Sequence, residues 1–195
     1  LVTEIEDGTF RSVKARRVHA IPAPSAKPLP LPPGDGAGAN ESAAFALMLD
    51  LPWQPGMQGA QDALRIAVHA QPWTRHVVFS SPEESGFEVR TTIEKRATMG
   101  FLPEAIEGVC SGRLDRGRSL TVDLLSGALE AVSRSRLLNG ANAAAVFSQN
   151  GAWEILQFMD AEEIAPSRWR LSGLLRGQLG TEDAMRAGAP PGAGF

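Results

Sequence analysis

The sequence has little of what catalytic and metal sites are usually built from. Cys110 is the only cysteine among 195 residues, which excludes an intrachain disulfide framework and a zinc site of paired thiolates. Tyrosine is absent, and three histidines are the only side chains that titrate near neutral pH. No Gly-x-Ser-x-Gly elbow, phosphate-binding glycine loop or His-Glu-x-x-His sequence occurs. These absences predict a protein that is not an enzyme and that holds neither a metal ion nor a cofactor.

Long apolar runs and an excess of basic residues are also missing. No apolar run approaches the ~20 residues of a membrane span, so no stable membrane insertion is expected. The net charge of −3 argues against a stable nucleic-acid complex, because neutralising phosphates requires a basic surface. The chain begins at Leu1 in a stretch patterned like a strand, which indicates a fragment of a longer polypeptide.

Glycine and proline are plentiful, at 20 and 14 residues. Without long helical patterns, their frequency predicts many turns and short strands. Residues 21–40 combine clustered prolines with a Gly-Asp-Gly-Ala-Gly run, which cannot join the interior of a sheet. We therefore expect residues 1–20 to be a terminal strand of an upstream domain, residues 21–40 a linker, and residues 41–195 a β-rich domain.

The β-rich domain is predicted from alternating apolar and polar residues between turn signals. The Asn150-Gly151 pair, placed between two apolar runs, is the strongest hairpin signal in the chain. Helices are expected at residues 102–110 and 182–186, the second capped by Thr181 and stopped by Gly188. The expected fold is mainly β, with short antiparallel strands in a sandwich or small barrel-like arrangement and one or two minor helices. Strands are predicted at residues 9–19, 45–49, 64–70, 75–80, 87–93, 119–125, 143–148, 153–159 and 169–175.

The remaining candidates for acid–base or metal chemistry are weak. His69 and His76 stand on neighbouring predicted strands, but no third ligand is placed near them, which favours a solvated or hydrogen-bonded pair. Adjacent acidic residues on a strand point to opposite faces, so they do not form the facing carboxylates that glycoside hydrolysis needs. The acidic pairs are Glu83-Glu84, Glu162-Glu163 and Glu182-Asp183.

Four tryptophans carry more information than the titratable residues. Trp153 and Trp169 begin predicted strands, where a large side chain anchors a small core. Trp53 and Trp73 each follow a proline near a turn. An exposed indole at either position could bind sugar rings. The sequence therefore leaves open a carbohydrate-recognition module that uses Trp53 or Trp73 as its platform.

The most informative stretch is residues 138–182, which contains several short motifs in a fixed order. It resembles the C-terminal part of phage tail-tip proteins of the putative phage tail protein family, above all the large hub protein of gene transfer agents. Residues Leu49-Asp50-Leu51-Pro52 and Ala70-Gln71-Pro72-Trp73 also fit this pattern. The motif residues are Gly140-Ala141-Asn142, Trp153-Glu154, Gln157-Phe158, the strand from Trp169 to Arg176 and Gly177, and Gly180-Thr181-Glu182.

The resemblance implies a structural protein of the tail tip, or baseplate hub, of a phage or phage-like gene transfer agent. Such hubs are typically homotrimers that close the tail tube, bind other tail and baseplate proteins, and support host attachment and DNA delivery. The implied location is the virion tail tip, assembled in the bacterial cytoplasm, with DNA in contact only in transit and a host surface glycan as a further partner. The TIM-barrel-like region of the full-length hub is not recognisable here, so no hydrolase activity is expected.

Arg176 and Glu182 flank the turn from Gly177 to Gly180 in this motif region. We expect these two side chains to position the turn through hydrogen bonds or an ion pair. Gly177 and Gly180 are expected to adopt backbone angles that other residues resist.

Overall fold

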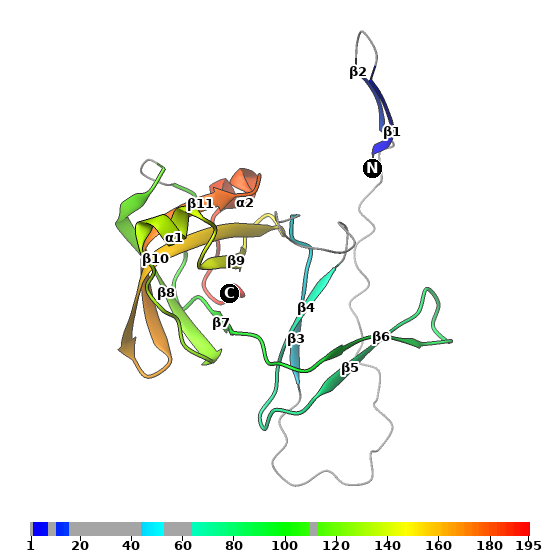
Figure 1. Cartoon of the computed structure of the whole chain (residues 1–195), viewed down its shortest axis with the longest axis horizontal. Helices are drawn as coiled ribbons and strands as arrows, with labels where there is room; N and C mark the ends of the chain where they lie inside the picture. The colour runs from blue at the N-terminus through cyan, green and yellow to red at the C-terminus, as the bar shows by residue number, and fades with distance from the viewer. Residues whose placement is uncertain (1, 8–10, 16–43, 53–63, 110–112) are drawn as a thin grey trace. The chain divides into compact units, whose positions relative to one another are not determined.

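The computed structural model describes residues 2–7, 11–15, 44–52, 64–109 and 113–195 (Figure 1). The chain divides into two compact units, Leu1–Ala39 and Asn40–Phe195. In the first unit β1 (Val2–Asp7) pairs antiparallel with β2 (Arg11–Ala15). This hairpin corrects the expectation of one strand over residues 9–19. The predicted linker, residues 21–40, lies outside the described residues, and the predicted domain boundaries stay predictions.

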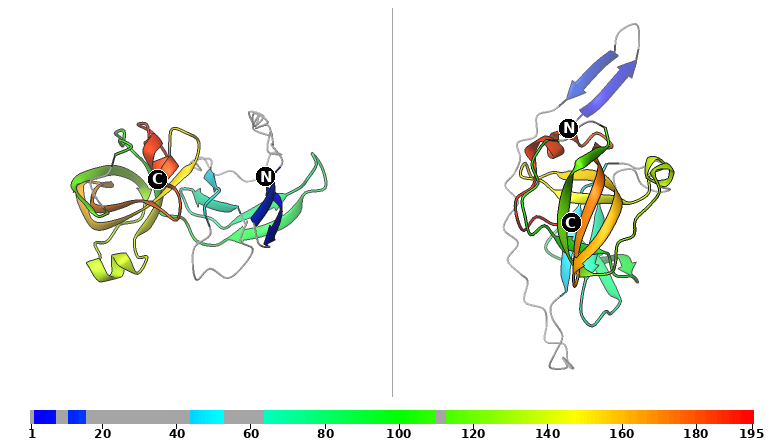
Figure 2. Two further views of the ribbon diagram at one scale, coloured as in Figure 1. Left: turned by 90° about the horizontal axis from the view of Figure 1, so that it is seen from above. Right: turned by 90° about the vertical axis from the view of Figure 1, so that its left-hand side faces the viewer.

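A curled antiparallel sheet of five strands forms the body of the second unit (Figures 1 and 2). Its strand order is β7-β8-β11-β10-β9. The expected mainly β fold is therefore confirmed, although three of the strands are longer than predicted. The strands are β7 (Met99–Phe101), β8 (Asp115–Ser126), β9 (Ala143–Phe147), β10 (Trp153–Ala165) and β11 (Arg168–Gln178).

The core follows from the alternation of apolar residues on these strands. On β8, Leu120, Val122 and Leu124 are buried while their neighbours are exposed or half-buried. On β10 the pattern changes, because all six residues from Trp153 to Phe158 are buried. A strand buried on both faces lies where other segments cover the outer side of the sheet. Leu156, Phe158, Trp169, Leu171 and Leu174 complete the main apolar cluster with the β8 residues.

The Asn150-Gly151 prediction is confirmed as the turn of the β9–β10 hairpin, in which Phe147 pairs with Trp153. Gly151 has a φ of +80°, and the Asn150 side chain accepts a hydrogen bond from the Ala152 N–H. The loop between the paired residues is longer than a two-residue turn. Its geometry is held by the Asn side chain as well as by the glycine.

Two further hairpins precede the sheet in sequence. β3 (Phe45–Leu49) pairs with β4 (Arg65–His69), and β5 (His76–Ser80) pairs with β6 (Glu88–Ile93), both antiparallel. All four strands were predicted within one residue at each end. The β3–β4 hairpin contacts the sheet region through the Phe45 and Phe101 rings, whose centroids are 5.4 Å apart, and through His69 Nδ1, 3.2 Å from Ser126 Oγ.

One predicted helix is wrong. Residues 102–109 form bends and one isolated β-bridge: the Leu102 N–H donates to the Ala193 carbonyl, and Ile106 pairs with Ala189. Pairing with the distant C-terminal segment overrides the local helical tendency. Cys110, the last residue of the predicted helix, lies outside the described residues.

The helices that do form are short. α2 (Glu182–Ala187) confirms the predicted second helix, and Gly188, with a φ of +70°, ends it. α1 (Arg134–Leu138) was not predicted; its N-terminus is capped by the Ser133 side chain, which accepts from the Arg136 N–H. Within the described part of the chain, no helix is long and apolar enough to cross a membrane.

Candidate functional site

A buried ion pair lies at the centre of the motif region, between neighbouring strands β10 and β11. Arg176 Nε lies 2.5 Å from Glu154 Oε1, and Arg176 Nη2 lies 2.7 Å from Glu154 Oε2. The side chains are only 3% and 1% exposed. The planar guanidinium therefore meets the carboxylate in a bidentate fork. This geometry offsets the cost of removing both charges from water.

The Glu154–Arg176 pair also binds the backbone of two other segments. The Gly177 N–H donates to Glu154 Oε1 at 3.1 Å, and Arg176 Nη1 donates to the Glu107 carbonyl at 3.3 Å. Opposite this pair the β10–β11 register shifts between Ile155 and Gln157, which places an extra residue in β11. The Glu154–Arg176 pair thus connects the β-bulge of β11 and the segment of residues 102–109 to the sheet.

Arg176, which was predicted to position the turn together with Glu182, forms its ion pair with Glu154. Glu182 is exposed and begins α2. A Cβ built on Gly177, whose φ is +59°, would lie 3.2 Å from the Glu182 Cα, so this glycine admits the start of α2. The sequence does contain a signal for Glu154 as the partner of Arg176. Glu154 stands inside an apolar run, and a buried carboxylate requires a cation or several hydrogen-bond donors.

Gln157 has a similar role on the other side of β10. Its Nε2 donates to the Leu137 carbonyl at 2.8 Å and to the Ala141 carbonyl at 2.7 Å. Asn142, with a φ of +54°, donates from Nδ2 to the Glu130 carbonyl at 2.7 Å. The Gly140-Ala141-Asn142 motif is therefore the turn that connects α1 to β9, and Gln157 fixes it from the sheet.

Thr181 connects the second turn of the motif to β10. Its Oγ1 donates to the Gln178 carbonyl at 2.7 Å and accepts from the Ile155 N–H at 2.9 Å. Thr181 is the N-cap residue of α2, as predicted, but its hydroxyl makes no capping hydrogen bond to that helix. As expected, Gly180 has a positive φ, +81°, and so does Leu179 before it, +58°. The Thr181 hydroxyl therefore bonds to the backbone of β10 and not to the first turn of α2.

The tryptophans divide into core and surface positions. Trp153 and Trp169 are 8% and 9% exposed and pack in the interior. Trp73 is half-buried, with its Nε1 donating to the Glu94 carbonyl and the Arg96 guanidinium 5.9 Å from its ring centroid. The ring centroid of His76, the first residue of β5, lies 5.2 Å from that of Trp73. Trp53, the other predicted platform, lies outside the described residues.

Groups able to do acid–base or metal chemistry are dispersed in the described part of the chain. No cluster of three or more His, Cys, Asp or Glu side chains there could hold a metal ion. The predicted histidine pair is not formed: His69 contacts Ser126, whereas His76 contacts Trp73. Of the acidic pairs, Glu162 and Asp183 form exposed ion pairs with Arg170 and Arg186.

One exposed ion pair shifts the titration of its carboxylate. Arg168 Nε and Nη2 donate to the two Asp123 oxygens at 2.6 and 2.7 Å, across β11 and β8. These hydrogen bonds lower the pKa of Asp123 and raise that of Arg168. The pair lies where the two strands end and supports their pairing.

Comparison with known proteins identifies the family. No curated protein matches the sequence closely enough to indicate a relationship. A family model described as Rcc01698-like, C-terminal, matches residues 97–195. The matched region begins just before β7 and contains the whole five-stranded sheet, the Glu154–Arg176 pair and both helices. Because the match covers half of the chain, this protein belongs to the Rcc01698-like, C-terminal family.

Proposed function

We propose that this chain is a structural module of the tail tip, or baseplate hub, of a phage or phage-like gene transfer agent. The motif resemblance suggests this role, and membership of the Rcc01698-like, C-terminal family is compatible with it. In this role the module closes the tail tube with other baseplate proteins and supports host attachment and DNA delivery. It performs no catalysis of its own.

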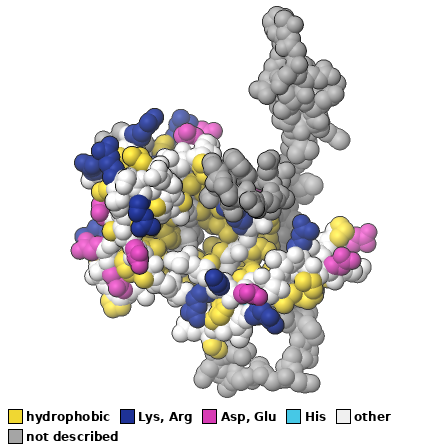
Figure 3. All heavy atoms as spheres, in the orientation of Figure 1, with side chains coloured by type: hydrophobic (Ala, Val, Ile, Leu, Met, Phe, Trp, Pro, Cys, Tyr) yellow, Lys and Arg dark blue, Asp and Glu magenta, His cyan; other side chains and the backbone are white. Residues whose placement is uncertain are grey.

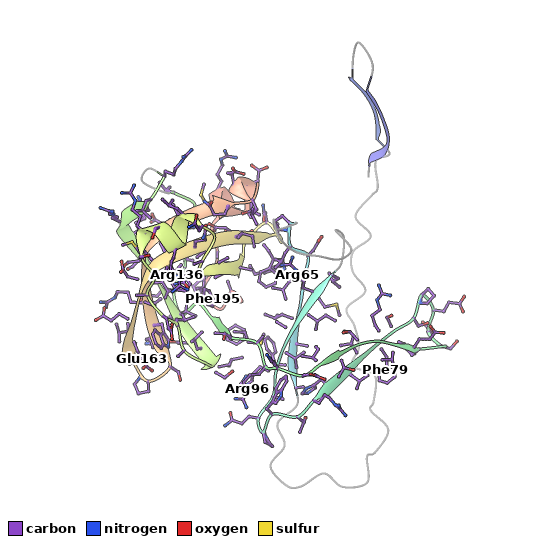
Figure 4. All side chains as sticks on the ribbon, viewed as in Figure 1. Arg65, Phe79, Arg96, Arg136, Glu163 and Phe195 are labelled. Carbon is purple, nitrogen blue, oxygen red and sulfur yellow. The ribbon has the colours of Figure 1, made fainter. Side chains whose placement is uncertain are left out.

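The observation that carries the proposal is the apolar surface of the β5–β6 hairpin. Val77, Phe79, Phe87 and Val89 are exposed by 44%, 54%, 53% and 62%. Figure 3 shows apolar side chains on this hairpin's surface, and Figure 4 marks Phe79 on β5. A two-stranded hairpin is marginally stable in water by itself. An exposed apolar patch on such a hairpin is typical of a surface that other subunits cover in an assembly.

The motif residues have architectural roles that suit an assembly protein. Glu154, Arg176, Gln157 and Thr181 all satisfy backbone or side-chain groups within the fold. A rigid sheet held by such contacts can present a docking hairpin at a defined position. A catalytic site would instead leave reactive groups directed toward an open pocket.

The test combines particle imaging with a matched pair of variants. Phe79→Glu places a charge in the exposed apolar patch, and Thr91→Glu places the same charge at an exposed polar position on β6. We expect F79E to be lost from purified particles by immunoblot and T91E to be retained. Cryo-electron microscopy should show threefold density for the wild-type chain around the channel of the tail tip. Retention of F79E, or absence of the wild-type chain from particles, would reject the proposal.

Carbohydrate recognition is the second candidate, and the half-buried Trp73 is the observation that favours it. Arg96 and His76 both contact its ring, so they compete with a sugar for its faces. Glycan-array binding that disappears in Trp73→Ala would establish this activity. Equal binding by wild type and W73A would exclude Trp73 as a platform.

A further inference from the structure

The sequence contains the tripeptide Asn-Gly-Ala twice, at residues 139–141 and 150–152. In an Asn-Gly pair the backbone nitrogen of the glycine can attack the asparagine carboxamide, because glycine has no side chain to hinder the approach. The product of this attack is a five-membered succinimide ring. Since the reacting residues are the same in both copies, a difference in their reactivity must come from the structure around them.

The Asn150 carboxamide is held by three hydrogen bonds. Its Oδ1 accepts from the Ser148 hydroxyl and from the Ala152 N–H, the latter at 3.1 Å. Its Nδ2 donates to the Asp183 carbonyl at 3.4 Å, which connects the β9–β10 turn to α2. Ser148 is only 2% exposed, so its hydroxyl is itself fixed within the fold. The carboxamide must break these bonds before it can rotate toward the Gly151 nitrogen.

The Asn139 carboxamide is exposed, and among the described residues it has no hydrogen-bond partner. Asn139 is the C-cap of α1, a helix of five residues. The Gly140 N–H donates to the Leu137 carbonyl at 3.0 Å, and this bond closes the last turn of the helix. Helix ends open locally at a low cost in free energy, so the Gly140 nitrogen becomes available without unfolding of the sheet.

Steric crowding does not separate the two turns. A Cβ built on Gly140 or on Gly151 would meet no atom within 4 Å, and both glycines have a positive φ, +90° and +80°. The Gly151 N–H, like that of Gly140, donates to a backbone carbonyl, in this case that of Ser148 at 3.1 Å. The two turns therefore differ chiefly in the hydrogen bonds of the Asn150 carboxamide.

We propose that Asn139-Gly140 is a site of spontaneous deamidation in the folded chain, whereas Asn150-Gly151 is protected by the hydrogen bonds of its carboxamide. The Gly140 backbone nitrogen loses its proton to solvent and forms a bond to Asn139 Cγ. The bond from Cγ to Nδ2 breaks, and ammonia leaves with a proton from water. Water then opens the succinimide at either carbonyl, which gives aspartate or isoaspartate at position 139. The reaction needs no oxidant or cofactor, and it does not depend on a tail-tip role.

The modification alters a turn that the sheet holds in place. Gln157 Nε2 donates to the Leu137 and Ala141 carbonyls, on either side of Asn139, and α1 lies beside β10 there (Figure 1). Isoaspartate adds a methylene carbon to the main chain at position 139, so the two carbonyls cannot both keep their places at Gln157. The new carboxylate also lies at the C-terminal end of α1, where a negative charge is unfavourable. Deamidation therefore loosens the turn between α1 and β9.

Ageing of the wild-type full chain tests the site. The folded protein is incubated at neutral pH in water labelled with heavy oxygen, which marks each hydrolysed succinimide. Peptides are then mapped by mass spectrometry with electron-transfer fragmentation, which distinguishes isoaspartate from aspartate. We expect label at position 139 to appear at least about tenfold faster than at position 150. In urea, where the local structure is lost, the two rates should agree within about threefold.

Two variants test the protection and its consequence separately. Ser148→Ala removes one donor to Asn150 and should raise the rate at position 150 at least about threefold, with position 139 as an unchanged internal control. Asn139→Gln keeps an amide, but its longer side chain closes the ring far more slowly. Amide hydrogen exchange at Ala141, whose N–H donates to the Arg136 carbonyl, should accelerate in aged wild type and stay constant in aged N139Q.

Three results would overturn the proposal. The first is a rate at position 139 in the folded chain more than about a hundredfold below its rate in urea, since the turn would then be protected. The second is a rate at position 150 in the folded chain that equals or exceeds the rate at position 139. The third is an unchanged rate at position 150 in S148A, since the hydrogen bonds of the carboxamide would then give no protection.

Discussion

The five-stranded sheet and the β5–β6 hairpin have similar strand patterns, but they differ in the exposure of their apolar side chains. In the sheet, Leu156, Phe158 and Leu171 are almost fully buried. In the hairpin, Phe79 and Val89 remain more than half exposed. The family match covers the first region and not the second. The difference shows that the sheet region supplies its own core, whereas the hairpin leaves large apolar side chains exposed.

Ion pairs show a contrast between buried and exposed positions within the five-stranded region itself. The sheet contains a bidentate pair, Glu154–Arg176, that is shielded from water, whereas the pairs Arg170–Glu162 and Arg186–Asp183 are exposed. A shielded pair is costly to break because removing one partner leaves the other charge buried. An exposed pair contributes little because water replaces the lost partner. Substitutions in the buried pair should therefore lower stability far more than substitutions in the exposed pairs.

The largest effect is expected for Glu154→Ala. Loss of the carboxylate leaves the Arg176 guanidinium buried without its partner and removes the acceptor of the Gly177 N–H. We expect a loss of about 3–5 kcal/mol in the free energy of unfolding, measured by urea denaturation. Glu162→Ala, on the exposed part of the same strand, should change it by less than about 0.5 kcal/mol. Equal effects of the two variants would contradict the assignment of Glu154 as a buried structural charge.

A phenylalanine-to-alanine substitution in each region compares directly how much a buried and an exposed side chain contribute to the free energy of unfolding. Phe158→Ala should cost about 3–5 kcal/mol, because it opens a cavity in the main apolar cluster. Phe79→Ala removes a side chain that is 54% exposed and should cost less than about 1 kcal/mol in the isolated chain. Thermal and urea unfolding of the two variants give the comparison. A large loss for F79A would mean that the hairpin patch is part of the core of this chain.

A smaller effect is expected from Gly100→Ala on β7. A Cβ at this position would overlap the carbonyl oxygen of Asp123 on neighbouring β8. The strands must separate, so we expect a loss of about 1–3 kcal/mol in the free energy of unfolding. Gly117→Ala on β8 is the control: its nearest atom, Asp115 Oδ1, lies 3.7 Å away, and the change should be neutral or slightly stabilising. A neutral G100A would show that β7 moves freely against β8.

The smallest effect concerns pH and the Asp123–Arg168 pair. Because Arg168 lowers the pKa of Asp123, the stabilisation is present above the unfolded-state pKa and is lost as the pH falls through the lowered folded value. Wild type should therefore be more stable than Asp123→Asn at about pH 5, and the difference should shrink toward about pH 2–3. Urea midpoints at the two pH values provide the measurement. A difference that does not depend on pH would contradict an ionic role for Asp123.

Local pattern in the sequence was sufficient for most of the strands. Alternation placed β3, β4, β5 and β6 within one residue, and Asn150-Gly151 located the β9–β10 hairpin. It underestimated β8, β10 and β11. The missed end of β10, residues 160–165, is mostly exposed and lacks apolar alternation, whereas the missed end of β11, residues 176–178, contains the β-bulge and the charge that pairs with Glu154. It also missed α1, a single short turn whose Ser133 cap is its main local signal.

The motif residues were found from the sequence, but their contacts were not. Glu154, Gln157 and Thr181 each bond to a segment between 16 and 26 residues away. Such partners depend on strand order and on the β11 bulge, neither of which has a local signature. For this reason the sequence assigned Arg176 and Glu182 a shared role at the turn without identifying Glu154, on the neighbouring strand, as the partner of Arg176.

The sequence by itself determined the β-rich class, the turn positions and the residues of the motif region, because these depend on backbone propensities and short-range periodicity. Tertiary structure alone decided the strand order, the burial of the Glu154–Arg176 charges and the pairing of residues 102–109 with the C-terminal segment. These features arise from contacts between residues far apart in the chain, and their free energy is gained only when the whole sheet has formed.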